Sequence, residues 1–316
     1  MDDPVATPLR RLTRTEYNNT VRDLLGVDLA PADNFPVDEI AGGFSNNASV
    51  LAVSPLLAEK DLEAAEALAA EAVKKLPTLL PCDPAAAGEE PCARQFVQRF
   101  GRRAYRRPLV DAEVARLMRA YSAGRSEGTF AAGIELVIQT ALQSPSFLYR
   151  FEFGLPARAG DKTVRLTQHE VATRLSYLLW GSMPDDRLAS AADAGRLGDA
   201  AAVAAQAREM LNDGRARRAV GEFYRQWLGV TTIETVSKDA AVHPEFTDEL
   251  RGAMRAELQF FVEHVLWTGD RRLATLLTAP LGFPSASLAR LYGVRGPVTP
   301  AQPVTLPANE RAGVLT

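Results

Sequence analysis

The stretch Thr13-Arg-Thr-Glu-Tyr-Asn-Asn-Thr-Val-Arg-Asp-Leu-Leu-Gly26 contains the signals that begin and end an α-helix. Thr13 and Glu16 have the spacing of a capping box, and Gly26 is the residue type that most readily closes a helix. Asn18 and Asn19 lie inside this helix, although their side chains compete for backbone hydrogen bonds and lower helix stability. We interpret the two asparagines as polar groups held for tertiary contacts or for a ligand.

Nearly every other long segment also has apolar residues at helical spacing, so the sequence predicts an all-α fold. The expected architecture is a bundle-like body of many helices with a long irregular loop over 27–53. Short strands are compatible with the sequence only near 163–166 and 303–306. The further helices are predicted at 54–76, 91–105, 111–123, 129–143, 167–180, 199–212, 215–229, 245–267, 271–278 and 285–292, with a short one after Pro184.

The segment 154–163 is rich in Gly, Pro and Ala and is the best candidate for a domain boundary. Two lobes divided near residue 158 are therefore compatible with the sequence. Three regions are expected: an N-terminal helical region over 1–153, a second helical region over 164–293, and a Pro-rich tail over 294–316. The first of them contains the opening motif 12–26, the cysteine loop 82–92 and the helices of 91–151.

Composition narrows the classes of protein that this chain can represent. Its 316 residues carry a formal net charge of −3, and 47% of them are hydrophobic, which is typical of a globular protein with a full core. The chain lacks the basic excess of nucleic-acid-binding proteins, so no nucleic-acid partner is expected. No run approaches the roughly 20 apolar residues of a membrane span. The start, Met1-Asp-Asp-Pro, lacks the features of a signal peptide, so an exported form would have lost its targeting segment.

The chain contains two cysteines, Cys82 and Cys92, which frame a loop of turn-forming residues. This arrangement favours a disulfide and hence an oxidising compartment. The alternative is two unrelated free thiols in a cytosolic protein.

Residues for catalysis or metal binding are sparse. None of the histidines His169, His243 and His264 has another histidine at metal-ligand spacing. Glu257 and His264 share one face of a predicted helix, but seven residues at ~1.5 Å rise place them about 10.5 Å apart along its axis. They are the candidates for a catalytic site, which would need ligands from a second element. The chain has no C-x-x-C-H motif for covalent haem, so cofactor and metal remain unknown.

Polar residues inside well-capped helices suggest a buried network. We expect side chains of the first helix to contact the 27–53 loop and the arginine cluster near residue 105. The members of the predicted network are Tyr17, Asn18, Arg22, Asp23, Arg103 and Arg106.

Five motifs resemble the planctomycete-type secreted-domain (PSD-type) family, which is also abundant in myxobacteria. Leu12 to Gly26 looks like the opening domain of that family, and Phe100-Gly-Arg-Arg-Ala-Tyr-Arg-Arg-Pro-Leu109 is similar to the next. Ser144-Pro-Ser-Phe-Leu-Tyr-Arg150 and Leu175-Ser-Tyr-Leu-Leu-Trp-Gly-Ser-Met-Pro-Asp-Asp186 resemble the one that follows. Arg311-Ala-Gly-Val-Leu-Thr316 is similar to the first residues of a further domain.

The resemblance implies an exported, periplasmic or extracellular multidomain protein whose domains have unknown function. It also implies the disulfide, a C-terminal segment or domain beyond Thr316 as partner, and a redox partner, because family members often carry c-type cytochrome domains. The leading hypothesis is thus the helical body of an extracytoplasmic redox or degradative system. Two alternatives stay open: a metal- or haem-dependent oxidative or hydrolytic enzyme with a pocket between the lobes, and a binding module for a partner chain or polysaccharide.

Overall fold

A computed structural model describes residues 8–156, 160, 163–234 and 236–315. These residues form fifteen α-helices and four strands of two residues each, which confirms the all-α prediction. The chain divides into two compact units, Met1–Ala216 and Arg217–Thr316, which are described separately. Within the described residues, no helix combines the length and the apolar character needed to cross a bilayer.

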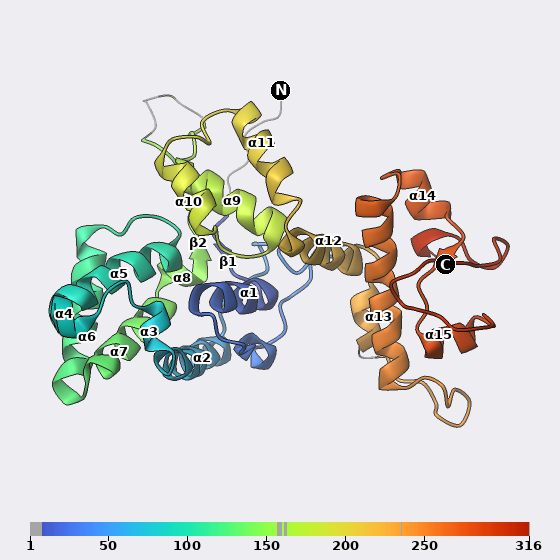
Figure 1. The fold of residues 1–316 in the computed structure, drawn as a ribbon, viewed down its shortest axis with the longest axis horizontal. Helices are drawn as coiled ribbons and strands as arrows, with labels where there is room; N and C mark the ends of the chain where they lie inside the picture. The colour runs from blue at the N-terminus through green and yellow to red at the C-terminus, as the bar shows by residue number, and fades with distance from the viewer. Residues whose placement is uncertain (1–7, 157–159, 161–162, 235, 316) are drawn as a thin grey trace. The chain divides into compact units, whose positions relative to one another are not determined.

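The first unit contains most of the helices (Figure 1). Its elements are β1 (Arg10–Arg11), α1 (Arg14–Leu25), the 3-10 helix η1 (Pro31–Asn34), α2 (Pro55–Val73), α3 (Leu76–Leu79), α4 (Pro84–Ala87), α5 (Glu89–Tyr105), α6 (Asp111–Glu127), α7 (Phe130–Leu142), α8 (Pro145–Leu148), β2 (Tyr149–Arg150), α9 (Gln168–Trp180), α10 (Asp186–Asp193) and α11 (Ala200–Met210). Helix α12 (Gly214–Trp227) begins in the first unit and continues into the second.

The predicted caps of α1 are confirmed. The Thr13 side chain accepts a hydrogen bond from the Glu16 backbone, and the Glu16 carboxylate accepts one from the Thr13 backbone. Gly26 adopts φ 66°, a left-handed conformation that costs glycine little. These local bonds satisfy backbone groups that every helix terminus leaves open, which explains why the sequence alone located both ends.

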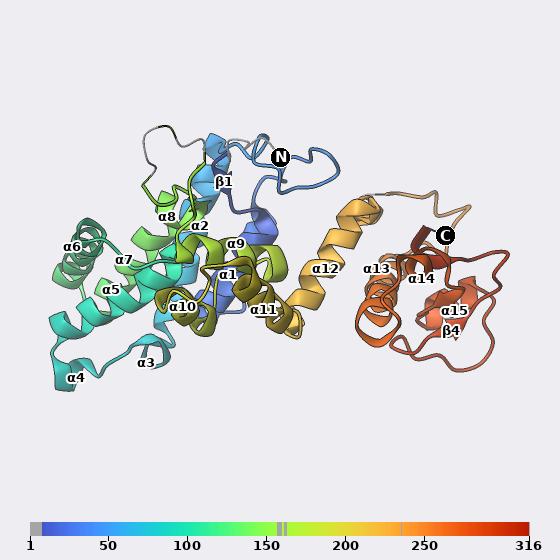
Figure 2. The ribbon, with the colours of Figure 1, turned by 90° about the horizontal axis from the view of Figure 1, so that it is seen from above.

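The core of the first unit lies among α1, α2, α5, α7 and α8. Val21, Leu68, Phe96, Ile134 and Phe147 come from these five helices, and each is at most 1% exposed. Helix α7 packs against both α2 and α6, and these helices lie side by side in Figures 1 and 2. The sequence predicted each of the long helices, because their apolar faces repeat at helical spacing.

Two strands that the sequence did not predict join distant parts of the first unit. Arg10 and Arg11 of β1 pair antiparallel with Arg150 and Tyr149 of β2. Since two residues are too few to show alternation, this pairing has no sequence signal. No strand forms over the described residues 163–166, so that expectation was wrong.

The packing does not divide near residue 158. Helices α9 and α10 have their own apolar cluster around Trp180 and Leu188, but Tyr177 and Met183 belong to the main core. The division into compact units lies at residues 216 and 217, inside α12, while the expected regions 1–153 and 164–293 stay predictions. A hydrogen bond of 2.9 Å between the hydroxyl groups of Thr20 in α1 and Tyr177 in α9 joins α9 to the main core, and a linker composition cannot reveal such a contact.

The second unit is built on α13 (Asp248–Glu263), which continues as a π-helical turn over His264–Thr268. Phe261, Val265, Leu276 and Phe283 form its core. The predicted strand near 303–306 is present as β4. The remaining elements are the 3-10 helix η2 (Val230–Glu234), α14 (Leu273–Thr278), β3 (Leu281–Gly282), α15 (Ala286–Leu291), β4 (Val304–Thr305) and the 3-10 helix η4 (Gly313–Leu315).

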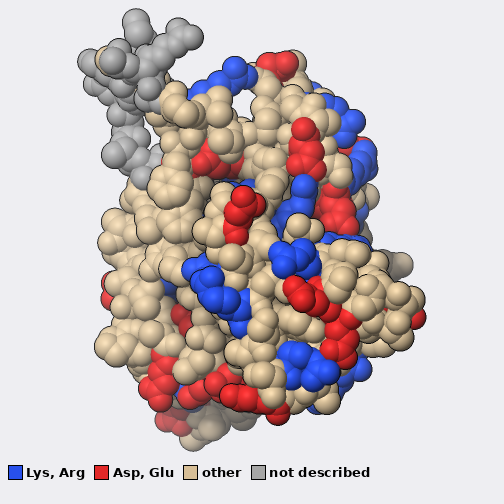
Figure 3. All heavy atoms as spheres, turned by 90° about the vertical axis from the view of Figure 1, so that its left-hand side faces the viewer, with Lys and Arg blue, Asp and Glu red and all other residues tan. Residues whose placement is uncertain are grey.

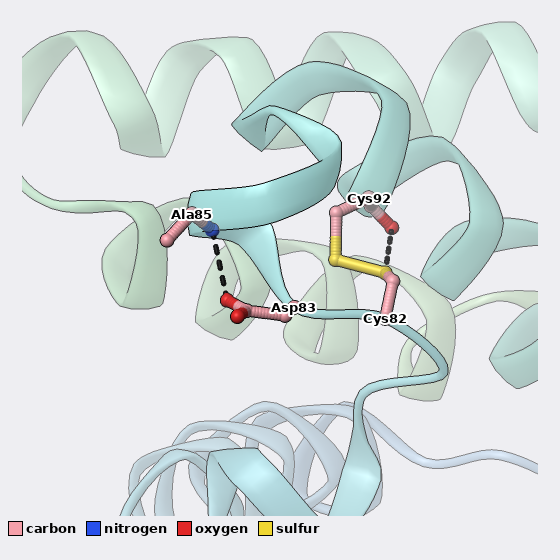
Figure 4. The surroundings of a disulfide bond; sticks show 4 residues. All are labelled: Cys82, Asp83, Ala85 and Cys92. Atoms are coloured by element: carbon pink, nitrogen blue, oxygen red, sulfur yellow. Dashed lines mark hydrogen bonds between the residues drawn. A yellow bond between two sulfur atoms is a disulfide. The ribbon is translucent and has the colours of Figure 1, made fainter.

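Cys82 and Cys92 form the predicted disulfide (Figure 4). The loop between them contains the short helix α4, whose first turn is capped by the Asp83 carboxylate accepting from the Ala85 backbone N–H at 2.9 Å. Cys92 lies in the first turn of α5 and is fully buried. The disulfide therefore ties the connection after α3 to a helix of the main core.

Candidate functional site

Asn18 of α1 holds the irregular loop that follows the helix. Its Oδ1 accepts from the Ala32 backbone N–H at 2.9 Å, and its Nδ2 donates to the Asp33 carboxylate at 2.9 Å. Both partners lie in η1, within the segment 27–53. A residue that weakens the helix locally is therefore used to fix a loop by two hydrogen bonds.

Replacing Asn18 by alanine should lower the stability of the first unit by about 1–3 kcal/mol, because the Ala32 N–H and the Asp33 carboxylate lose their partner. Urea unfolding measures the change. Alanine is also the better helix former, so any loss must exceed that gain. An unchanged unfolding midpoint would show that water replaces the asparagine at no cost.

A second set of contacts joins α1 to the segment after α9. Asn19 Nδ2 donates to the Gly181 carbonyl at 3.2 Å, and the Ser182 hydroxyl donates to the Asp23 carboxylate at 2.6 Å. Arg22 lies between them, donating to Asn19 Oδ1 at 3.0 Å and to Asp23 Oδ1 at 3.3 Å. These bonds hold the end of α9 against α1, although the two helices are separated by about half of the chain length in the sequence.

Arg103 binds the C-terminal end of α1. Its Nη2 donates to the Asp23 carbonyl at 2.9 Å and its Nη1 to the Leu24 carbonyl at 3.3 Å. The Asp186 carboxylate lies 3.6 Å from Arg103 Nε. Because the last carbonyls of a helix lack intrahelical partners, a cation is favourable at this position.

Arg106 has a different role from the rest of the predicted network. It is 7% exposed and its Nη2 donates to the carbonyls of Ser146, Phe147 and Tyr149 at 2.7–3.0 Å. Its backbone is left-handed, with φ 59°, which is costly for a residue with a side chain. Burial lowers the pKa of the guanidinium. Arg106 therefore fixes the course of the chain from α8 into β2.

Tyr17 packs as an aromatic core residue. Its ring contacts Phe35 and Phe147 edge to face at centroid distances of 5.0 and 5.7 Å. Its hydroxyl is buried and has no hydrogen-bond partner among the described residues. Burial, with a contribution from the Asp61 charge, raises the pKa of Tyr17.

Asp61 of α2 is a buried carboxyl, 8% exposed, whose pKa burial raises from 3.8 to about 6 despite the opposing charge of Arg11. Between pH 4 and 6 the folded state thus binds more protons than the unfolded state. Protonation of Asp61 therefore contributes at most about 3 kcal/mol to the free energy of unfolding. This contribution is complete below pH 3.8 and is lost as the pH rises through 6.

Asp61→Asn should abolish this part of the pH dependence, because an amide cannot ionise. We expect the free energy of unfolding at pH 7.5 to rise by roughly 1–3 kcal/mol. Urea titrations at several pH values between 4 and 7.5 test this. The exposed Glu59 of the same helix provides the control, since Glu59→Gln should leave the pH profile unchanged. Equal profiles for the parent and Asp61→Asn would contradict the prediction.

The two candidate catalytic residues lie in the second unit and do not contact each other directly. Glu257 accepts from the Phe283 backbone N–H at 3.0 Å and from the Tyr292 hydroxyl at 2.5 Å. The His264 ring packs against the Phe283 ring at 5.3 Å. Both carboxylate oxygens of Glu257 are thus engaged in holding the chain around Phe283. Among the described residues, no group of three or more His, Cys, Asp or Glu side chains gathers as a metal site.

The first unit contains a groove of about 430 Å³, a size typical of small-ligand sites. Three segments line it: the turn after α5, the extended segment after α8 and the first turns of α9. The lining side chains include four aromatic rings, those of Tyr105, Tyr149, Phe151 and Phe153. The groove is thus lined by segments that come before and after the linker 154–163 in the sequence.

The aromatic rings form a row along the extended segment. Tyr149 and Phe151 have a centroid distance of 6.4 Å, and Phe151 stacks on Phe153 at 5.1 Å with an interplanar angle of 22°. Phe153 is 76% exposed, which is unusual for so large an apolar side chain. Glu152, which lies between Phe151 and Phe153 in the sequence, forms an ion pair with Arg174. Alternation in an extended chain therefore places the three rings on one side.

Polar groups fix the walls of the groove. The Glu170 carboxylate accepts from the backbone N–H groups of Phe153, Gly154 and Thr167 at 2.7–3.0 Å, so it orients the aromatic segment. Arg107 pairs with Glu113 through both guanidinium nitrogens, at 2.8 and 2.9 Å.

His169 lines the same groove and is held in place by a carboxylate. Its Nε2 lies 3.0 Å from Asp193 Oδ1. A hydrogen bond from Arg102 is the main cause that lowers the pKa of Asp193; burial opposes it, and His169 adds to the lowering. His169 is therefore oriented by an ionised partner.

Sequence reasoning did not identify the residues that line this groove, although one alternative placed a pocket between the two lobes. Tyr149, Phe151 and Phe153 alternate with Arg150 and Glu152, and this alternation was the available signal. Five residues are short for a strand assignment, and the helix-rich context favoured a helical interpretation.

Comparison with protein families agrees with the motif resemblance. Residues 10–74 match PSD3, a protein of unknown function (DUF1587); residues 92–152 match PSD5, a protein of unknown function (DUF1595); and residues 166–294 match PSD4, a protein of unknown function (DUF1592). The chain therefore contains three domains of the PSD type, all of unknown function. No curated protein and no solved structure matches the chain.

One detail of the resemblance needs correction. The motif Ser144–Arg150 falls in the same matched domain as the 100–109 motif, and not in the domain that contains 175–186. The structure gives the reason, because Arg106 binds the carbonyls of Ser146 and Tyr149 directly. The groove lies where the second and third matched segments meet.

Proposed function

We propose that this chain is the helical body of an exported multidomain protein and that its aromatic groove binds a polysaccharide. The row of Tyr149, Phe151 and Phe153 carries the proposal. Aromatic faces stack on the apolar C–H faces of sugar rings, and a row of rings suits a ligand that repeats such faces. The polar rim, with Ser146 and His169, offers hydrogen bonds to hydroxyl groups.

Affinity electrophoresis in native gels tests the binding. The gels contain one soluble polysaccharide each: a neutral β-glucan, a xylan, a pectin or a soluble chitosan. We expect one of them to retard the protein, and Phe153→Ala to weaken the retardation at least tenfold. Because Phe153 is 76% exposed, its removal should leave the fold intact.

Phe223→Ala is the matched control, since Phe223 is a half-exposed ring of the second unit. Retardation that is equal in the parent and in Phe153→Ala would overturn the proposal. So would the absence of retardation by all four polymers, and a peptide ligand would then be the better interpretation of the groove.

A hydrolytic enzyme is the second candidate function, and the His169–Asp193 pair favours it. A histidine oriented by a carboxylate is a suitable general base, and His169 lines the groove. Release of reducing ends from the bound polysaccharide, lost in His169→Ala, would support hydrolysis. Binding without release would restrict the protein to a binding module. Elemental analysis for iron, copper and zinc tests whether such an enzyme depends on a metal ion or on haem.

Export to the periplasm or the cell exterior is the third part of the proposal. It is supported by the disulfide, because such bonds persist mainly in oxidising compartments. In protein isolated from its native host, Cys82 and Cys92 should react with a maleimide only after reduction, and the protein should fractionate outside the cytoplasm. Cytoplasmic protein with reactive thiols would overturn this part.

The family resemblance alone supports a place in a redox or degradative system, together with a C-terminal domain and a redox partner. The absorption bands of a c-type haem in the full-length protein would support the redox form. Their absence, together with polysaccharide binding, would favour the degradative form.

A further inference from the structure

A second and much smaller cavity, of about 20 Å³, lies beside the groove in the first unit. Four arginines at the end of α5 line it, together with His169 of α9 and Asp186 of α10. The arginines are Arg102, Arg103, Arg106 and Arg107. The volume suffices for about one water-sized sphere.

The charges around the cavity do not balance. Arg102 pairs with Asp193, Arg103 lies 3.6 Å from Asp186, and Arg107 pairs with Glu113. Arg106 forms no ion pair within the part of the chain that the structure describes, and its observed partners are carbonyls and the Tyr177 hydroxyl. A buried charge without a counter-charge is unfavourable, and one negative charge would compensate it.

A hydrogen-bond donor also remains unused at this cavity. Arg103 Nε is buried and has no hydrogen-bond partner among the described residues. The Asp186 carboxylate oxygen Oδ1 is 3.6 Å away, which is too far for a hydrogen bond. Asp186 itself is largely exposed to solvent and does not fill the space.

We propose that this cavity binds one monovalent anion of halide size, which is chloride under ordinary conditions. The anion accepts a hydrogen bond from Arg103 Nε and balances the charge of Arg106. Its size follows from the cavity, which is too small for a phosphate or sulfate group. Because the lining comes from α5, α9 and α10, the bound anion stabilises the packing of these helices. The cavity shares Arg106, Arg107 and His169 with the groove, but its test does not depend on polysaccharide binding.

Thermal unfolding of the whole chain tests the proposal. Sodium chloride is raised from 5 to 200 mM, while sodium gluconate keeps the ionic strength constant. We expect the melting temperature of the first unit to rise by about 2–5 °C, because a ligand that binds only the folded state stabilises it by mass action. Sodium bromide should act similarly. An equal effect of sodium phosphate at the same concentrations would overturn the assignment to a halide.

The matched variants lie on one helix. Arg103→Gln should lose the chloride dependence, whereas Arg94→Gln, near the other end of α5, should keep it. A crystal soaked in sodium bromide provides a second measurement that does not depend on the variants. An anomalous peak in the cavity supports the site. A melting temperature indifferent to chloride, or an ordered water only in the cavity, overturns it.

Discussion

Arg106→Ala is expected to destabilise the first unit by about 3–5 kcal/mol, because each buried polar group that loses its hydrogen-bond donor costs about 1–3 kcal/mol. The carbonyls of Ser146, Phe147 and Tyr149 would lose their donor. Because these carbonyls fix the segment that carries the aromatic row, the variant should also weaken ligand binding in the groove. Urea unfolding measures the first effect and affinity electrophoresis the second.

Two controls separate the side chain from the backbone. Arg106→Gly should be more stable than Arg106→Ala by about 1–2 kcal/mol, because φ is 59° at this position. Arg99→Met removes an exposed arginine of α5 and should have little effect. If Arg106→Ala costs no more than Arg99→Met, the guanidinium does not hold the segment.

Trp180 can report unfolding of the first unit alone. The chain has three tryptophans, and Trp227 and Trp267 belong to the second unit. Replacing those two by phenylalanine leaves Trp180 as the only fluorophore of this kind. Its burial, at 5% exposed, should give a large change in emission on unfolding.

Gly124→Ala is the second change for which we expect a large loss, about 1–3 kcal/mol or more. A Cβ atom at Gly124 of α6 would lie 2.6 Å from the Ala132 carbonyl oxygen of α7. That oxygen belongs to the backbone, so the two helices would have to move apart. Urea unfolding of the first unit measures the loss.

Gly252→Ala is the matched control, since Gly252 also lies within a helix and a Cβ there meets nothing within 4 Å. It should stabilise the second unit by about 0.5–1 kcal/mol, because alanine is the better helix former. A loss at Gly252 similar to that at Gly124 would show that the close approach of α6 and α7 is not the cause.

The surface adds little to these arguments. The face shown in Figure 3 carries acidic and basic side chains interspersed, without an extended region of one sign. The net charge of −3 is consistent with that mixture.

Helix ends were the part of the fold that local reasoning predicted best. The capping box at Thr13 was predicted from residue spacing and is present, and Thr167 and Glu170 form a second one with the same spacing at the start of α9. Asp185 caps α10, accepting from the Leu188 backbone N–H at 2.9 Å. Each of these bonds spans three residues, so its geometry is contained in a short stretch of sequence.

Long-range contacts could not be predicted in the same way. The asparagines in α1 indicated tertiary contacts, but the sequence could not show that Asn19 would bind Gly181, 162 residues away. It also could not show that Tyr177 would join the main core.

The sequence by itself determined the helical class, most helix ends and the disulfide, because hydrophobic spacing, caps and two cysteines on a short loop act over a few residues. Only the tertiary structure decided that Arg106 binds the chain after α8, that three aromatic rings line a groove and that a small cavity collects four arginines. These features depend on which faces of distant helices are buried together, and that choice depends on the packing of the whole unit.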